Sequence, residues 1–212
     1  MFYMVLAGIL SSYLLGSIPF AYIFGRVIKG TDIRKFGSGN VGATNALRLL
    51  GPLFGITVLI LDILKGMLAV TWLADYFLLY FSGSAVTLRI LFAIACICGH
   101  NWTLFLRFKG GKGVATTLGA ITGLAIMIEG LRVILLLVIL VWVLVFLIIR
   151  LVSLASIISA ISFPVFVFLF RQPKELFLLS VILAAFILIR HKKNIHGIFS
   201  GRESPLNLKN RN

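Results

Sequence analysis

The stretch "LRVILLLVILVWVLVFLII", residues 131–149, decides the fold class of this chain. It carries a single charge, on Arg132, and a helix needs about 20 mostly apolar residues to cross the hydrocarbon layer of a membrane. The rest of the chain has the same character, since 60% of its 212 residues are hydrophobic and its mean hydropathy is +1.11. This composition is far more apolar than that of a soluble domain and predicts an integral membrane protein.

Six further segments are apolar enough to be spans, so we expect an all-α, polytopic membrane bundle of about seven transmembrane helices. The N-terminal stretch has no basic n-region and no small-residue cleavage site, which predicts a retained first span and not a signal peptide. Residues 1–203 are expected to form a single membrane domain, followed by a polar tail at 204–212. The predicted spans are 2–25, 52–73, 86–107, 114–128, 131–149, 153–170 and 175–190.

Lysine and arginine are distributed unevenly over the predicted loops. Fifteen fall on the side of the C-terminus and four on the other side, in a chain of net charge +14. Because basic loops stay in the cytoplasm, the C-terminus is expected to be cytoplasmic and, with an odd number of spans, the N-terminus outside. The charge could serve only to fix topology and attract anionic lipid, but that does not explain the glycines among the basic residues.

The stretch "DIRKFGSGNVGATNALRLLG", residues 32–51, departs from ordinary loop composition. Its glycines can adopt positive φ and let a ligand approach the backbone closely: Gly37, Gly39 and Gly42. A short helix is expected to run to about residue 50, capped by Asn40 or Thr44, and its N-terminus would favour an anion. A flexible loop with a helix cap is the alternative. The candidate binding residues are Gly39, Asn40, Asn45 and Arg48, with the Ser38 hydroxyl beside them.

The stretch "FKGGKGVATTLG", residues 108–119, precedes the fourth predicted span. It is not a Walker A loop, because Lys112 is followed by glycine and not by Ser or Thr. Three glycine amides before a helix N-terminus can nevertheless form an anion-binding nest, to which two lysines add mobile charge. The alternative is a basic turn between spans, yet three glycines beside paired lysines favour a phosphate. The candidate substrate-binding residues are Lys109, Gly110, Gly111, Lys112 and Gly113.

The stretch "RHKKNIHGIFSGRE", residues 190–203, follows the last predicted span. His191 can exchange a proton near neutral pH, and Asn194 projects from the same face if the helix continues. Glu203 is, with Asp32, one of two acids on the predicted cytoplasmic side. Taken alone, such a stretch is more often a positive-inside anchor, so its interest comes from the two glycine-rich loops.

Polar residues inside the predicted spans are interpreted as structural. Asp62 and Lys65 stand three residues apart and are expected to neutralise each other. His100 is interpreted as a satisfied core histidine, and Ser153 as a helix cap at the mouth of the sixth span. The two cysteines stand two residues apart and face different sides of one helix, which predicts neither a disulfide nor a metal site.

Together the three segments resemble the signature motifs of the bacterial acyl-phosphate-dependent glycerol-3-phosphate acyltransferases. The matching stretches are "GSGNVGATN" (37–45), "GH" with "FKGGKGVAT" (99–116) and "RHKKNI" with Glu203 (190–203), and "GSIPFAYIFGR" and "LDILKG" are similar to that family as well. The resemblance implies transfer of an acyl chain from acyl phosphate to glycerol 3-phosphate, giving lysophosphatidic acid and phosphate, the first acylation of phospholipid synthesis. It implies catalytic roles for Ser38, His191, Asn194 and Glu203, and substrate contacts for Arg48, Lys112 and Ser153.

One position departs from the family pattern. His196 is followed by Gly197, where the family more often has an arginine two residues after "NI". One basic contact is therefore missing or is supplied by Lys192 or Lys193.

The chemistry of the residues suits this activity. Both substrates carry phosphate, and acyl phosphate is an activated mixed anhydride, so the protein must orient a hydroxyl and stabilise charge without building a strong nucleophile. No aspartate stands five residues after any histidine, which argues against the His–Asp machinery of soluble acyltransferases. Two cytoplasmic acids are too few for a two-metal site, so we expect no metal and no cofactor. Either His191 or the phosphate of the substrate could take the hydroxyl proton.

An anion transporter is the alternative function, since glycine-broken cationic segments between spans can form one. A transporter would need polar groups at the membrane midplane, whereas here they concentrate on the cytoplasmic side. A lipid-binding scaffold would need the basic patches but not His191, Asn194 and Glu203. The expected partners are acyl phosphate, glycerol 3-phosphate and membrane lipids, with no nucleic acid. The expected form is a monomer in the bacterial inner membrane.

Overall fold

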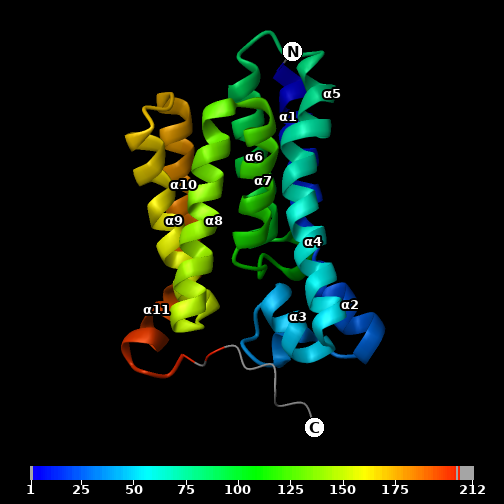
Figure 1. Ribbon diagram of the computed structural model, residues 1–212. Helices are drawn as coiled ribbons and strands as arrows, with labels where there is room; N and C mark the ends of the chain where they lie inside the picture. The colour runs from blue at the N-terminus through cyan, green and yellow to red at the C-terminus, as the bar shows by residue number, and fades with distance from the viewer. Residues whose placement is uncertain (1, 204, 206–212) are drawn as a thin grey trace. The chain divides into compact units, whose positions relative to one another are not determined.

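The computed structural model describes residues 2–203 and 205, and every regular element in them is a helix (Figure 1). The chain divides into two compact units, Met1–Leu124 and Ala125–Asn212. The predicted polar tail, 204–212, lies outside the described residues except for Pro205.

The first unit consists of helices joined by the two loops that carry the glycine-rich motifs. In chain order its elements are α1 (Phe2–Ser17), α2 (Phe20–Lys29), the 3-10 turn η1 (Ile33–Lys35), α3 (Ala43–Leu50), α4 (Pro52–Leu68), the π-helical turn η2 (Ala69–Leu73), α5 (Ala74–Leu78), α6 (Ala85–Asn101), the 3-10 turn η3 (Leu104–Leu106) and α7 (Val114–Met127), which runs past the end of the unit.

The first predicted span, 2–25, is not one continuous helix. α1 ends at Ser17 and α2 begins at Phe20. Pro19 has no amide to continue the hydrogen-bond ladder and disfavours helical backbone at Ile18, which explains the break. The prediction of a single helix is therefore wrong at this point, and the carbonyls freed by the break need other partners.

Small residues let the helices of the first unit approach each other closely. A side chain at Gly16 in α1 would clash with the carbonyl of Cys96 in α6. A side chain at Gly119 in α7 would clash with the carbonyl of Ile63 in α4. Such backbone contact is typical of membrane proteins, in which helices associate by close packing because lipid is as apolar as their side chains.

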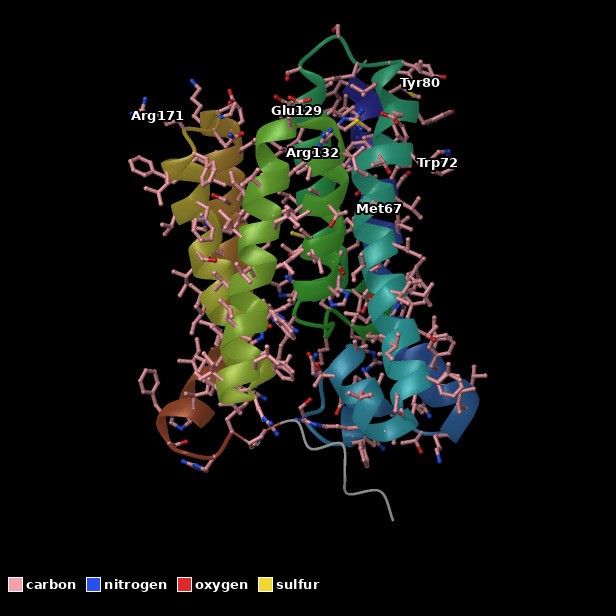
Figure 2. The ribbon with its side chains drawn as sticks, in the orientation of Figure 1. Met67, Trp72, Tyr80, Glu129, Arg132 and Arg171 are labelled. Atoms are coloured by element: carbon pink, nitrogen blue, oxygen red, sulfur yellow. The ribbon has the colours of Figure 1, made fainter. Side chains whose placement is uncertain are left out.

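α4, η2 and α5 form one continuous helical segment, Pro52–Leu78. Figure 2 shows Met67 partway along it, with Trp72 and Tyr80 near the end that lies away from α2 and α3. Trp72 and Tyr80 are both exposed. Exposed Trp and Tyr of this kind are enriched at the boundary between lipid and water, so this end fits a membrane interface.

The second unit contains α8 (Glu129–Ile149), α9 (Val152–Leu169), α10 (Lys174–Arg190) and α11 (Lys192–Phe199). α9 packs against both α8 and α10, and the short α11 packs against α9 and α10. Figure 2 shows Arg132 near the start of α8 and Arg171 after α9, both at the end of the unit opposite α11.

The helical content confirms a polytopic membrane protein. All seven predicted spans are helical, and five helical segments among the described residues are long and apolar enough to cross a membrane. The other two predicted spans correspond to α7, with 14 residues, and α10, with 17, which are shorter than these five segments. The number of spans and the orientation of the termini stay predictions. The five segments are Phe2–Lys29, Pro52–Leu78, Ala85–Leu106, Glu129–Ile149 and Val152–Leu169.

Candidate active site

The first loop is shaped by the buried amide of Asn45. Its Nδ2 donates to the carbonyls of Ile33, Phe36 and Asn40 at 3.0, 3.0 and 3.1 Å. Its Oδ1 accepts from the amide of Ser38 at 3.2 Å, and the residue is 1% exposed. Because the loop backbone occupies both Nδ2 and Oδ1, Asn45 holds the loop in shape. This structural role differs from the predicted one, in which Asn45 contacts substrate.

The backbone of this loop confirms part of the predicted flexibility. Gly37 and Gly39 have φ of +55° and +68°, which favours glycine, whereas Gly42 has an extended backbone that needs no glycine, although a Cβ there would stand 3.0 Å from Asn40 Nδ2. α3 begins directly after Gly42, with no side-chain cap. The predicted cap is therefore wrong, because Thr44 already lies inside the helix and Asn40 stands two residues before its N-cap.

The loop directs its polar groups outward. Ser38 and Arg48 are exposed, and Asn40 is half-buried, with its amide donating to Ser38 Oγ at 3.5 Å. Asp32 lies at the base of the loop and accepts from Arg34 Nη2 at 2.7 Å. This hydrogen bond lowers the pKa of Asp32 to about 2, despite the opposing effect of burial. The guanidinium of Arg34 is therefore occupied by its hydrogen bond to Asp32.

The second loop folds back onto the end of α6. The amide of Gly110 donates to the carbonyl of Asn101 at 3.2 Å, and that of Gly111 donates to the carbonyl of His100 at 3.0 Å. A side chain at Gly111 would clash with the His100 ring and would stand 2.7 Å from the Val41 carbonyl. The predicted anion nest is therefore wrong for these two amides, since the glycines serve close backbone packing instead.

The remainder of the second loop leads into α7. Gly113 has φ of +80° and immediately precedes the helix, Lys112 is half-buried and Lys109 is exposed. The side chain of Asn101 lies against Gly113, is fully buried, and finds no hydrogen-bond partner among the described residues. This part of the loop therefore brings Lys112 to within two residues of a helix N-terminus, where anions are favoured.

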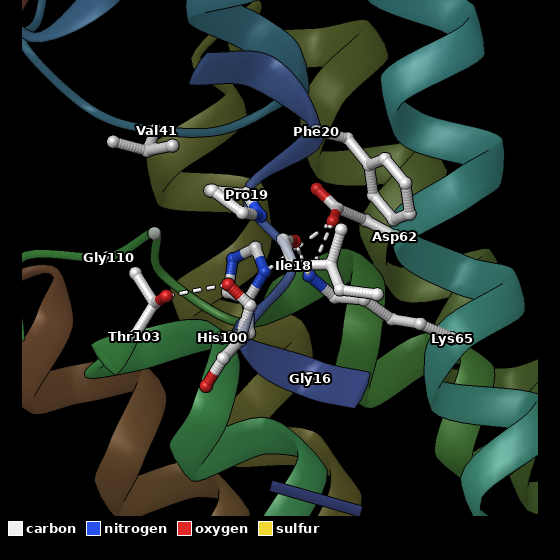
Figure 3. Close-up of a pocket in the computed structure, with 12 residues that line it drawn as sticks. Gly16, Ile18, Pro19, Phe20, Val41, Asp62, Lys65, His100, Thr103 and Gly110 are labelled. Atoms are coloured by element: carbon white, nitrogen blue, oxygen red, sulfur yellow. Dashed lines mark hydrogen bonds and ion pairs between the residues drawn. The ribbon is translucent and has the colours of Figure 1, made fainter. Parts of the chain in front are cut away.

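A small polar cavity lies beside the second loop (Figure 3). Asp62, Lys65 and His100 line it, and its volume of about 10 Å³ has room for roughly one water molecule. Lys65 Nζ lies 2.8 Å from Asp62 Oδ1, which confirms the predicted neutralising pair, and His100 Nδ1 lies 3.6 Å from the same oxygen. The cavity is too small for a glycerol phosphate.

In the second unit, Glu203 gathers the polar groups of the third segment. Ser153 Oγ and Asn194 Nδ2 both donate to Glu203 Oε1, at 2.8 and 2.6 Å. The amides of Arg202 and Glu203 donate to the carbonyl of Gly197 at 2.8 and 3.2 Å, which turns the chain back. The predicted cap role of Ser153 is wrong, because its hydroxyl bonds to this carboxylate.

His191 lies at the junction of α10 and α11, so the last predicted span ends where expected and a separate short helix follows it. Its Nδ1 is 2.8 Å from the carbonyl of Ile187, and the side chain is 2% exposed. A carbonyl can only accept, so Nδ1 carries the hydrogen and Nε2 carries the lone pair of the neutral ring. This contact fixes a hydrogen on Nδ1, which is the arrangement that a proton acceptor at Nε2 would need.

Each unit thus gathers part of the predicted site. Val41 and Gly111 bring the first and second loops together in the first unit, and Glu203 joins two other candidates in the second. No signal in the sequence indicates the buried Asn101 side chain, or the Gly197 carbonyl as the acceptor that turns the chain back, because both depend on contacts between distant parts of a loop. Residues 2–203 and 205 contain no group of three or more His, Cys, Asp or Glu side chains that could hold a metal ion.

Comparison with known proteins finds relatives that cover nearly the whole chain. The family model described as glycerol-3-phosphate acyltransferase matches residues 6–201. The glycerol-3-phosphate acyltransferase of Thermoanaerobacter sp. (strain X514) is 38% identical over 213 residues, which cover 98% of this chain and 98% of that protein. That of Desulforamulus reducens (strain ATCC BAA-1160 / DSM 100696 / MI-1) is 42% identical over 202 residues, covering 95% and 94%.

The solved structures agree. A crystal structure of PlsY (YgiH), an integral membrane glycerol 3-phosphate acyltransferase in its glycerol 3-phosphate form, superposes with a TM-score of 0.83 at 37% identity, covering 95% of this chain and 94% of that one. The lysophosphatidic acid form of PlsY gives a TM-score of 0.80. These matches span nearly the entire chain, including both glycine-rich loops and most of the third segment, and nothing in them favours the transporter alternative. The chain belongs to the glycerol-3-phosphate acyltransferase family.

Proposed function

We propose that this enzyme takes its acyl chain from acyl phosphate. The hydroxyl of glycerol 3-phosphate attacks the acyl carbonyl, the bond from that carbon to the phosphate oxygen breaks, and the products are lysophosphatidic acid and inorganic phosphate. The proton of the hydroxyl leaves to a base. The reaction needs no metal and no cofactor, because the donor is already activated.

The observation that carries this proposal is the hydrogen bond from Ser153 to Glu203. A serine that formed an acyl-enzyme would need a histidine to take its proton. Ser153 instead donates to a carboxylate that also accepts from Asn194, so it is a fixed polar group. Ser153 is therefore not set up to form an acyl-enzyme, which favours direct attack of the glycerol 3-phosphate hydroxyl on a donor that is already activated, as acyl phosphate is.

We assign the handling of phosphate to the basic and polar groups of the two loops. Lys112 and Arg48 neutralise phosphate, with support from Lys109, since charge-assisted hydrogen bonds to phosphate are the strong ones. Ser38, with its exposed hydroxyl, contacts the reacting groups. Gly39, Asn40 and Gly113 allow close approach. Asn45, Gly110 and Gly111 keep the loops in position, because hydrogen bonds within the chain occupy their polar groups.

Two groups can accept the proton of the attacking hydroxyl. His191 carries a lone pair on Nε2, because Nδ1 donates to Ile187. The phosphate of glycerol 3-phosphate is the other, since the second pKa of a phosphate ester is about 6. The pH–rate profiles of wild type and His191→Gln separate the two. Loss of the rate together with loss of the acidic limb, on which a general base becomes protonated, assigns the base to His191, and retention of that limb assigns it to the substrate.

We further propose that the chain crosses the bacterial inner membrane seven times as a monomer, forming a single membrane domain over residues 1–203, with the N-terminus outside. The basic asymmetry of the sequence supports this orientation, with fifteen basic residues on the side of the C-terminus and four on the other. The reaction then takes place at the cytoplasmic face, where acyl phosphate and glycerol 3-phosphate are both available.

The test of the donor is direct. Purified enzyme is mixed with glycerol 3-phosphate and either acyl phosphate or acyl-CoA, and both lysophosphatidic acid and the leaving group are measured. We expect stoichiometric phosphate release with acyl phosphate and much slower transfer from acyl-CoA. Preference for acyl-CoA would overturn the proposed donor and leave the acyl acceptor unaffected.

A further inference from the structure

Three ionisable side chains are buried together inside the first unit. Asp62, Lys65 and His100 are 3%, 2% and 7% exposed. Lys65 Nζ and His100 Nδ1 both face Asp62 Oδ1, at 2.8 and 3.6 Å. Burying such charges at membrane depth is expensive, and a well-packed apolar core would serve stability at least as well. The triad therefore calls for a role other than packing.

The triad lies where interruptions of helical backbone meet. At the break between α1 and α2, the carbonyl of Ile18 accepts from Lys65 Nζ at 3.1 Å, and the carbonyl of Ser17 accepts from Thr103 Oγ1 at 2.6 Å. Lipid offers no partner for a freed carbonyl, so non-helical backbone within a membrane must be satisfied by the protein. Lys65 thereby ties the α1–α2 break to α4 (Figure 3).

His100 ties the same triad to the second loop. It occupies the last turn of α6, where its carbonyl accepts from the amide of Gly111 at 3.0 Å. Its ring lies so close to Gly111 that a side chain there would clash, and the carbonyl of Val41 from the first loop borders the same position. The imidazole is thus held by Asp62 on one side and borders the glycine turn on the other.

We infer that Asp62, Lys65 and His100 are positioning residues for the reaction, which set the Gly110–Gly111 turn and thereby place Lys112 for phosphate binding. This inference rests on the proposed function of Lys112. The triad does not touch substrate, because the cavity that it lines holds about one water molecule. Small displacements of a binding group are costly to an enzyme, so a loosened turn should weaken substrate binding before it unfolds the protein.

The test compares Lys65→Met with a matched control, Arg89→Met. Arg89 is also a buried cation in the first unit, paired with Asp75, but it lies in the first turns of α6 and His100 lies in its last. Their separation of 11 residues is about 16 Å along the helix. Three quantities are measured on each purified variant: amide hydrogen exchange of the peptide containing Gly110 and Gly111, the KM and kcat for glycerol 3-phosphate, and the melting temperature.

We expect both variants to lose melting temperature, because each removes a buried cation from its ion pair. Lys65→Met leaves the buried Asp62 without its lysine. Arg89→Met leaves the exposed Asp75 and the carbonyl of Val70 without their donor. Lys65→Met alone should speed exchange of the Gly110–Gly111 amides and raise KM about tenfold or more, with a smaller change in kcat. If Lys65→Met lowers the melting temperature but has the same exchange rate and KM as Arg89→Met, the inference is overturned and the triad is only a structural ion pair.

If Lys65→Met does not fold, the charge-balanced double variant Asp62→Asn/Lys65→Met takes its place. It removes both charges together, so it should melt above Lys65→Met, although the carbonyl of Ile18 still loses its donor, while exchange and KM still rise. Wild-type exchange and KM in this variant would equally overturn the inference. This outcome can be told apart from failure of the proposed acyl donor. A wrong donor is detected with the wild-type enzyme alone, whereas the exchange measurement tests the triad without any substrate.

Discussion

At Glu203, one carboxylate oxygen accepts two short hydrogen bonds, from Ser153 and Asn194. Hydrogen bonds to a charged acceptor contribute about 1.5–3 kcal/mol, against about 0.5–1.5 kcal/mol for neutral pairs. Glu203→Gln keeps an acceptor oxygen but removes the charge, so kcat/KM should fall about tenfold. Glu203→Ala leaves both donors without a partner and should cost about 100-fold or more. Steady-state kinetics with both substrates measure these losses.

The neighbouring Arg202 supplies the control for Glu203. Arg202 is exposed and its side chain donates only to Ser200 Oγ among the described bonds, so Arg202→Gln should keep activity close to wild type. Equal losses in Glu203→Gln and Glu203→Ala would show that the charge matters and the two hydrogen bonds do not.

Asp32 gives the first loop an acid-sensitive anchor. Its pKa is lowered from 3.8 to about 2, chiefly by the hydrogen bond from Arg34. A carboxyl whose pKa is lower in the folded state stabilises that state above its unfolded pKa and loses this effect as the pH falls through the folded value. The melting temperature of the wild type should therefore exceed that of Asp32→Asn at pH 6, and the difference should shrink between about pH 4 and pH 2. A difference that is constant over this range would contradict the assignment.

Motif and spacing selected the residues of the candidate site, but they did not predict the partners of the hydrogen bonds that these residues make. The loops, their glycines and the role of Lys65 as partner of Asp62 follow from motif and spacing. By contrast, the amides of Gly110 and Gly111 are occupied by carbonyls from the end of α6, and the amide of Asn45 by three carbonyls of its own loop. These pairings depend on how the chain turns in space, which the residue types permit but do not dictate.

At the scale of elements, the contact between α4 and α7 depends on Gly119. A Cβ there would clash with the carbonyl of Ile63, a backbone atom that cannot turn aside. Gly119→Ala should therefore destabilise the first unit by about 1–3 kcal/mol, the usual cost of overpacking, and lower the melting temperature in detergent by several degrees. Thr122→Ala on the same helix is the control, since that hydroxyl bonds to the Leu118 carbonyl of its own helix. A Gly119→Ala variant as stable as this control would show that the two helices can separate at little cost.

The helices themselves were predictable, because apolar runs of this length form few structures other than membrane helices. The interruptions of these helices were harder to predict. The break at Ile18 was overlooked because the apolar pattern continues across Pro19, and the π-helical turn at Ala69–Leu73 has no marker in composition. Local backbone chemistry, the proline after Ile18, explains the break. Features such as the π-helical turn depend on packing against neighbouring helices.

At the scale of the whole molecule, the distribution of charge and the lengths of the helices bear on one question, the number of spans. α10 has 17 residues and is about 26 Å long, slightly short of a hydrocarbon layer of about 30 Å. Lys174 and Arg190 stand at its two ends, where long basic side chains can reach the lipid headgroups. If α10 crosses, three helices separate Glu129 from Ser200, and these residues lie on opposite sides. If it does not, α8 and α9 alone cross, and both residues lie on one side.

Single cysteines at these two positions decide between seven spans and fewer. Both residues are exposed, and the background carries alanine at Cys96 and Cys98, the two native thiols. In sealed inside-out and right-side-out vesicles, an impermeant maleimide should label Ser200→Cys only from the cytoplasmic side and Glu129→Cys only from outside, because the basic residues around α11 are held in the cytoplasm. Labelling of both from one side would remove α10 from the spans and, with it, the odd count that places the N-terminus outside. Labelling on opposite sides, but with Glu129→Cys in the cytoplasm, would retain the three crossings and reverse the orientation of the enzyme.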